Sequence, residues 1–166
     1  MSDARDVRDA QGSTAPAVSV IIPVRNEGGF VGRAIESIVR SGAGVPSYEI
    51  IVVDGMSDDD TRDVVSRAQA LHDNVTLLDN PARTVPLALN IGVRAAAADV
   101  IIRVDGHAEV DPAFLAANLR ELDAHPECAC VGGPIESVDL DPDSASISLA
   151  MSSRFGVGNA RFRTGG

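Results

Sequence analysis

Residues 100–110 read VIIRVDGHAEV. The β-branched run at the start predicts a strand buried on both faces, from about Asp99 to Val104. Asp105, Gly106 and His107 follow it directly, where ligands of open α/β sheets collect. With Gly106 leaving room between them, a carboxylate and an imidazole there can share a divalent cation, preferably Mn²⁺ over Mg²⁺. From these three residues alone, an ordinary Asp-Gly turn is the simpler interpretation.

The segments around this stretch alternate between β-branched runs and helical periodicity. A parallel sheet with right-handed crossovers follows from that order, which makes the fold class α/β. The expected strands are Val18–Ile22, Glu49–Asp54, Val75–Leu78, Asp99–Val104 and Cys128–Val131, and the expected helices cover residues 30–40, 61–71, 85–97 and 111–124. Residues 1–17 are polar and aperiodic and are expected to form a disordered leader, with the folded domain spanning residues 18–166.

Composition narrows the functional class. The 166 residues carry a formal net charge of −10, which argues against a nucleic-acid partner. No apolar run approaches the length of a membrane span and no signal-peptide core is visible, so the expected location is the cytoplasm. Cys128 and Cys130 are the only cysteines, and we expect free thiols in the core rather than a zinc site.

Acidic residues follow three of the expected strands. Glu27 comes just after the first strand, Asp54 ends the second and Asp105 ends the fourth. The C-terminal ends of parallel strands meet at one edge, so these residues predict a shared site suited to a nucleotide. A dinucleotide-binding Rossmann enzyme would need G-x-G-x-x-G after the first strand, and the chain has PVRNEGG at residues 23–29 instead.

Several of these segments resemble the motifs of family 2 glycosyltransferases of the GT-A fold. PVRNE at residues 23–27 matches the opening motif of that family, and VVDGMSDDDT at 52–61 resembles its acidic loop. NIG at 90–92, followed by Ala98 and Asp99, resembles the stretch before the metal strand. The DGHA form of the metal turn at 105–108 is most similar to succinoglycan-type polysaccharide glycosyltransferases.

This resemblance implies a GT-A-like domain with a mostly parallel sheet flanked by helices. It implies a metal-dependent inverting transfer of a sugar from a nucleotide-sugar, with UDP favoured, to a polysaccharide or lipid-linked acceptor at the inner face of a membrane. The residues it assigns to nucleotide binding are Pro23, Arg25, Glu27, Asp54 and Asp105. Asp105 and His107 would bind Mn²⁺ or Mg²⁺ in place of the D-x-D motif of the family. Arg83 is a further candidate for the phosphates, although a solvated loop arginine is the simpler interpretation.

The chain departs from the family pattern in two ways, one at the metal turn and one at the catalytic base. His107 keeps a metal ligand but removes a negative charge. The catalytic base of the family lies downstream of the segment that Gly156–Gly166 resembles, so the chain is expected to be truncated, with its base beyond Gly166. We do not assign that role to Glu109, Glu136 or Asp139.

Two alternatives remain open at this stage. A nucleotidyltransferase should show a Gly-rich basic loop after the first strand, and none is present. A non-catalytic nucleotide-sugar-binding or assembly fragment, lacking the base, would be expected to self-associate through apolar surface that truncation exposes.

Overall fold

The computed structural model describes residues 15–135, so most of the predicted leader, Glu136 and Asp139 lie outside the described residues. The chain divides into two compact units at Ala116, and the unit up to Ala116 contains the sheet. The elements are β1 (Val18–Val24), α1 (Gly28–Gly42), β2 (Tyr48–Asp54), α2 (Thr61–Leu71), β3 (Val75–Asp79), α3 (Val85–Ala95), β4 (Ile101–Arg103) and α4 (Phe114–Ala124). No described helix has the length and apolar content needed to cross a membrane.

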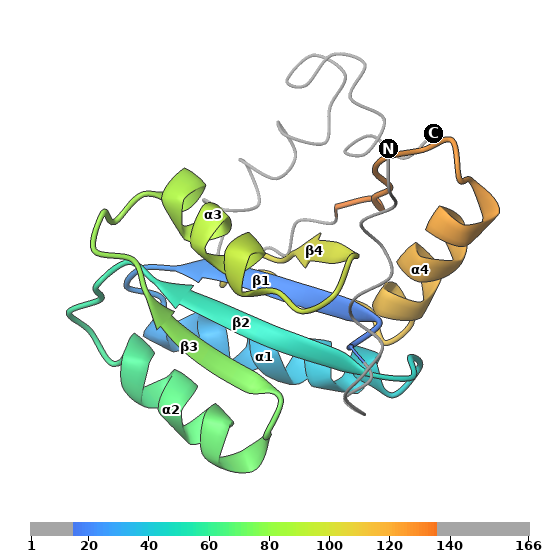
Figure 1. Ribbon diagram of the computed structural model, residues 1–166. Helices are drawn as coiled ribbons and strands as arrows, with labels where there is room; N and C mark the ends of the chain where they lie inside the picture. The colour runs from blue at the N-terminus through green and yellow to red at the C-terminus, as the bar shows by residue number, and fades with distance from the viewer. Residues whose placement is uncertain (1–14, 136–166) are drawn as a thin grey trace, which may run out of the picture. The chain divides into compact units, whose positions relative to one another are not determined.

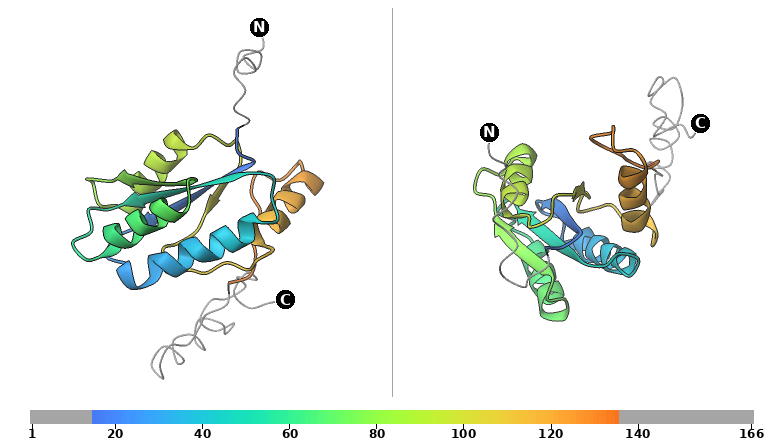
Figure 2. Two further views of the ribbon diagram at one scale, coloured as in Figure 1. Left: turned by 90° about the horizontal axis from the view of Figure 1, so that it is seen from below. Right: turned by 45° about the vertical axis from the view of Figure 1, so that its right-hand side comes forward.

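The four strands form one parallel sheet in the order β3-β2-β1-β4. Helices α1 and α2 cover one face and α3 covers the other (Figures 1 and 2). This confirms the α/β class and the strand–helix alternation that the sequence predicts.

The core lies on both sides of the two central strands. Every residue of β1 is buried, as are the last five residues of β2. Beneath α3, Ile21, Ile51 and Val53 of the sheet form a core cluster with Ala88 of the helix. Gly92 brings α3 close to β1, because a Cβ there would lie 2.5 Å from Ile21 Cγ2.

Strand β1 runs through Pro23, where the sequence predicts its end. Its N–H groups alternate between the two neighbouring strands: Ser19 donates to Val100 O, and Ile21 accepts from Val104 on the same side. Pro23 is the next residue facing that side and lies beyond Arg103, the last β4 residue. The missing N–H of the proline therefore costs no hydrogen bond of the ladder.

Two sequence predictions about this part of the chain are wrong. β4 is three residues long with Ile101 and Arg103 exposed, not a strand buried on both faces. It pairs only with β1 among the described residues, so its outer edge lacks the cover that a central strand has. Residues 128–131 form no strand, and without strand packing Cys128 and Cys130 are exposed thiols rather than core residues.

Candidate functional site

The C-terminal ends of the strands lie abreast, as the parallel order requires. Val24 of β1 is in register with Asp54 of β2, and Asp54 is in register with Asp79 of β3. The loops that leave these strands carry most of the residues that the sequence singles out.

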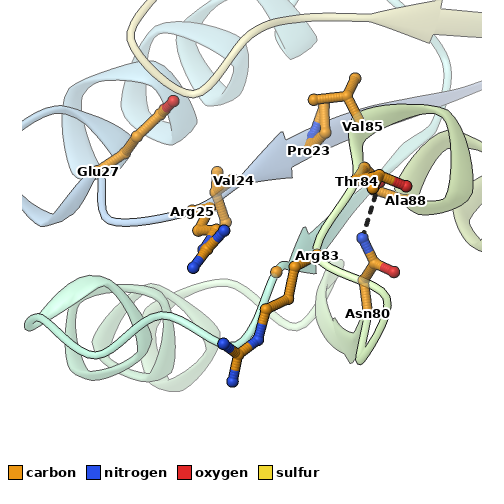
Figure 3. Close-up of a pocket in the computed structure, with 10 residues that line it drawn as sticks. Pro23, Val24, Arg25, Glu27, Asn80, Arg83, Thr84, Val85 and Ala88 are labelled. Atoms are coloured by element: carbon orange, nitrogen blue, oxygen red, sulfur yellow. Dashed lines mark hydrogen bonds between the residues drawn. The ribbon is translucent and has the colours of Figure 1, made fainter.

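A pocket of about 280 Å³ opens beside these strand ends. Pro23, Arg25 and Glu27 of the predicted nucleotide-binding set line it, and Asp54 and Asp105 do not. The remaining lining residues are Val24, Gly55, Asn80, Arg83, Thr84, Val85 and Ala88 (Figure 3). The pocket thus has an apolar wall from β1 and α3 and two guanidinium groups at its rim.

Arg83 is an exposed residue of the loop between β3 and α3, as the simpler interpretation expects, and it also lines this pocket. Its backbone has a φ of 59°, in the left-handed region that few residues other than glycine adopt. Its N–H donates to Asn80 O at 3.0 Å, and Asn80 Nδ2 in turn donates to Thr84 O at 2.9 Å. These bonds hold the loop between β3 and α3 against the pocket.

Asp54 is fully buried beneath the loop that follows β2. Its Oδ2 accepts from Ser57 N at 3.1 Å and from Arg62 Nη1 at 2.7 Å. Arg62 Nη1 also lies 2.8 Å from Asp79 Oδ1, so one guanidinium joins the ends of β2 and β3. These two carboxylates raise the pKa of Arg62.

The same loop is fastened to the segment after β1. Asn26 N donates to Ser57 Oγ at 2.9 Å, and Asp58 N donates back to Asn26 Oδ1 at 3.0 Å. Asn26 and Met56 both have left-handed φ values, 56° and 57°. Strain of this kind persists where the surroundings over-determine the backbone, which is common at binding sites.

Asp59 completes the connection at the start of two helices. Its Oδ1 accepts from Thr61 N at 2.9 Å, and its Oδ2 accepts from Gly28 N at 3.1 Å. Hydrogen bonds from the Thr61 hydroxyl and N–H lower the pKa of Asp59.

The turn after β4 has a different construction. Arg103 Nη2 lies 2.8 Å from Asp105 Oδ1, and His107 Nδ1 lies 3.2 Å from Glu27 Oε1. The side chains of Asp105 and His107 are 43% and 63% exposed, so both reach solvent.

Gly106 does not leave room for a ligand, contrary to the sequence interpretation. A Cβ at this position would lie 2.1 Å from Glu27 Oε2 and 2.6 Å from Val24 Cγ1. The glycine is needed because the Glu27 carboxylate already fills the space beneath the turn.

The donor atoms of the turn suit a divalent cation. Asp105 offers a carboxylate and His107 an imidazole nitrogen, a combination that suits Mn²⁺ better than Mg²⁺. No group of three or more His, Cys, Asp or Glu side chains within residues 15–135 is placed to hold a metal ion. Asp105 and His107 are therefore two candidate ligands and do not by themselves complete a metal site.

Glu109 and two of the histidines have ordinary partners away from the pocket. Glu109 pairs with Arg33 at 3.7 Å across an exposed surface, and His72 Nε2 contacts Glu36 Oε1 at 3.1 Å. His125 directly follows α4 and contacts Glu127 at 3.2 Å. None of them contributes to the strand-end site.

Sequence reasoning missed Arg62, Asn80 and Thr84. Arg62 carried a usable signal, since a cation in the first turn of a helix opposes the helix dipole and calls for an anionic partner. Asn80 is almost fully buried, and nothing in the periodicity of the segment marks it out.

Curated relatives of this chain are glycosyltransferases and polysaccharide-biosynthesis proteins. It is 32% identical over 127 residues to dolichyl N-acetyl-alpha-D-glucosaminyl phosphate 3-beta-D-2,3-diacetamido-2,3-dideoxy-beta-D-glucuronosyltransferase of Methanococcus voltae, covering 73% of the chain and 40% of that protein. It is 26% identical over 154 residues to the succinoglycan biosynthesis protein ExoA of Rhizobium meliloti, covering 92% of the chain and 46% of that protein. The chain thus spans less than half the length of these relatives.

Solved structures share the fold. The mannosyltransferase PcManGT of Pyrobaculum calidifontis, in complex with GDP-Man and Mn²⁺, superposes with a TM-score of 0.60 at 24% identity, covering 82% of this chain and 39% of that one. S. aureus TarS in complex with UDP-GlcNAc gives 0.56 at 18% identity, covering 72% and 37%. The family model for "Glycosyl transferase family 2" matches residues 19–164. The chain therefore belongs to glycosyl transferase family 2.

Proposed function

We propose that this chain is the donor-binding part of a metal-dependent inverting glycosyltransferase. The observation that carries the proposal is the pocket between Arg25 and Arg83, at the strand ends of a family 2 glycosyltransferase. In this proposal the pocket takes the nucleoside of a nucleotide-sugar, and the turn at residues 105–107 takes the diphosphate.

The predicted residues Pro23, Arg25 and Asp54 have different roles in the proposal. Pro23 and Val24 provide the apolar wall against which the base stacks, and Arg25 supplies positive charge toward the phosphates. Asp54 contributes to the site indirectly. Its carboxylate accepts hydrogen bonds from Ser57 and Arg62 and so holds the loop after β2 in place.

Asp105 and His107 are the proposed metal-binding residues. A cation held by these residues would supply Lewis-acid stabilisation of the negative charge that develops on a nucleoside diphosphate leaving group. Arg103 pairs with Oδ1 of Asp105 and so restrains the carboxylate.

The acceptor part of the proposal rests on the relatives. One is named for succinoglycan biosynthesis and the other for a dolichyl phosphate-linked sugar. A polysaccharide or lipid-linked sugar is accordingly the proposed acceptor, with donor binding on the cytoplasmic side of the membrane. UDP is the first nucleotide to test, because TarS was solved with UDP-GlcNAc.

The test is a calorimetric titration with UDP, in the presence and absence of Mn²⁺, on the wild type and on His107→Ala. We expect binding that requires Mn²⁺ and is weakened by the substitution. Glu109→Ala is the matched control, because its carboxylate pairs with Arg33 on the exposed surface. Folded protein that binds none of UDP, GDP and TDP would contradict the proposal.

A further inference from the structure

The contact between Glu27 and His107 joins two segments that are far apart in the sequence. Glu27 Oε1 lies 3.2 Å from His107 Nδ1, and the Glu27 side chain is only 22% exposed. The other oxygen, Oε2, is buried beneath Gly106. Figure 3 shows this side chain directed away from Arg25 and Arg83. Glu27 therefore faces the turn after β4 more than it faces the two arginines of the pocket.

The position of the Glu27 carboxylate is set by its backbone. Glu27 N donates to Thr61 Oγ1 at 2.8 Å, and its carbonyl accepts from Phe30 N and Val31 N, both at 2.9 Å, at the start of α1. The carboxylate lies so close to the turn that a Cβ at residue 106 would be 2.1 Å from its Oε2, so only a glycine leaves room for it there. A carboxylate held this way acts as a fixed support for the neighbouring imidazole.

The chemistry of the two groups fixes the tautomer of the ring. An ionised carboxylate only accepts hydrogen bonds, so the hydrogen of a neutral His107 ring must be on Nδ1. The lone pair is then on Nε2. His107 is largely exposed, and no described residue forms a hydrogen bond with its Nε2.

We propose that Glu27 is a positioning residue that holds His107 in the Nδ1–H tautomer and so makes Nε2 the nitrogen that binds the cation. The inference rests on the proposed function for its metal and sharpens it for this chain. A carboxylate that accepts from the far nitrogen raises the basicity of a metal-binding imidazole. It also returns to the turn the negative charge that His107 lacks in comparison with an aspartate.

The first experiment needs no metal. Long-range ¹H–¹⁵N correlation spectra at about pH 8, above the usual histidine pKa, report which ring nitrogen carries the hydrogen. The chain has 3 histidines, and His107→Ala assigns the signal. We expect Nδ1–H in the wild type, whereas an unconstrained imidazole prefers Nε2–H. An Nε2–H tautomer in the folded wild type would overturn the inference.

Substitution of Glu27 tests whether its hydrogen-bond acceptor matters rather than the volume of its side chain. Glu27→Met keeps a side chain of similar length under Gly106 but removes the acceptor, so we expect the Nε2–H tautomer to gain population. Affinity for Mn²⁺ in the presence of UDP should fall by about 10- to 100-fold, the usual cost of losing such a support. Glu109→Met is the matched control, since it removes an exposed carboxylate two residues from His107 and should change neither readout.

Two further variants test which nitrogen binds. The amide of His107→Gln reaches the position of Nε2, and that of His107→Asn reaches the position of Nδ1. We expect the glutamine variant to retain more Mn²⁺ affinity than the asparagine variant, and the reverse order would overturn the inference. If Glu27→Met does not fold by circular dichroism, Glu27→Gln replaces it, with mixed tautomers and an intermediate affinity expected.

The outcomes distinguish the two proposals. Wild-type protein that binds no nucleotide with Mn²⁺ would overturn the proposed function and the role of Nε2 with it. Wild-type binding that Glu27→Met leaves unchanged, while His107→Ala abolishes it, would overturn only the positioning role of Glu27.

Discussion

The loop after β2 and the turn after β4 both carry a strand-end aspartate, and the two aspartates are used differently. Asp54 is fully buried, and both of its oxygens accept hydrogen bonds from the loop or from Arg62. Asp105 is 43% exposed and pairs with Arg103 through one oxygen. The Asp54 carboxylate is fully used in contacts within the protein. The Asp105 carboxylate has one oxygen without such a contact among the described residues, which could bind a ligand.

This difference shows that an acidic strand end does not by itself identify a ligand contact. A buried carboxylate with several internal partners is part of the scaffold, because exposing it to a ligand would break those bonds. A half-exposed carboxylate in a short turn remains available. Glu27 connects the two regions. Its backbone N–H donates to Thr61 at the end of the loop after β2, and its carboxylate contacts His107 in the turn after β4.

The largest expected effect comes from removing Arg62. Arg62→Gln leaves the buried Asp54 carboxylate without its cationic partner. Because the Arg62 side chain is 39% exposed, solvent screens part of the interaction, and we expect a loss of about 2 kcal/mol. Urea unfolding at neutral pH measures the loss. The control is Arg67→Gln, an exposed arginine on the same helix, for which we expect less than about 0.5 kcal/mol. Equal losses of stability in both variants would contradict the claim that the buried Asp54 carboxylate depends on Arg62.

A smaller effect is expected at Gly106. Gly106→Ala pushes a methyl group into Glu27 and Val24, and overpacking of this kind costs about 1 to 2 kcal/mol. The change also displaces Glu27 from His107, so Mn²⁺-dependent UDP binding should weaken. Gly29→Ala is the control, because a Cβ there meets nothing within 4 Å. Thermal unfolding of both variants, followed by the UDP titration, gives the comparison.

The smallest expected effect is the acid dependence of Asp59. Its pKa is lowered in the folded protein, so the unfolded chain binds the proton more readily. The contribution is present above the ordinary pKa of 3.8 and is lost as the pH falls through the lower folded value. Asp59→Asn should therefore be less stable than the wild type near neutral pH and approach it in acid, as denaturant unfolding across this range would show. A gap that stays constant with pH would contradict the assignment.

The sequence predicts the central strands and α1 well, because the pattern of apolar residues that specifies each of them lies within the element itself. The buried runs at β1 and β2 and the stripe of Val31, Ala34, Ile35 and Ile38 on α1 specify strand and helix directly. The exposure of β4 is not local information, since it depends on whether another strand covers the edge. The same limit explains the wrong prediction for Cys128 and Cys130.

The sequence predicts which residues lie at the site, but it does not predict the contacts that their side chains form. Spacing and resemblance bring Arg25, Glu27, Asp105 and His107 to one edge. Nothing in the sequence shows that Asp54 turns toward Arg62, or that Glu27 lies beneath Gly106. Those contacts depend on side-chain directions in loops, where neither periodicity nor propensity applies.

The central claim is that the turn binds the ligand while the loop after β2 is already fixed. Amide hydrogen exchange with and without UDP and Mn²⁺ tests it most directly. We predict that added ligand protects residues 105–108 and 80–84 and leaves residues 56–61 nearly unchanged. Protection confined to residues 56–61, with none at 105–108, would contradict the claim.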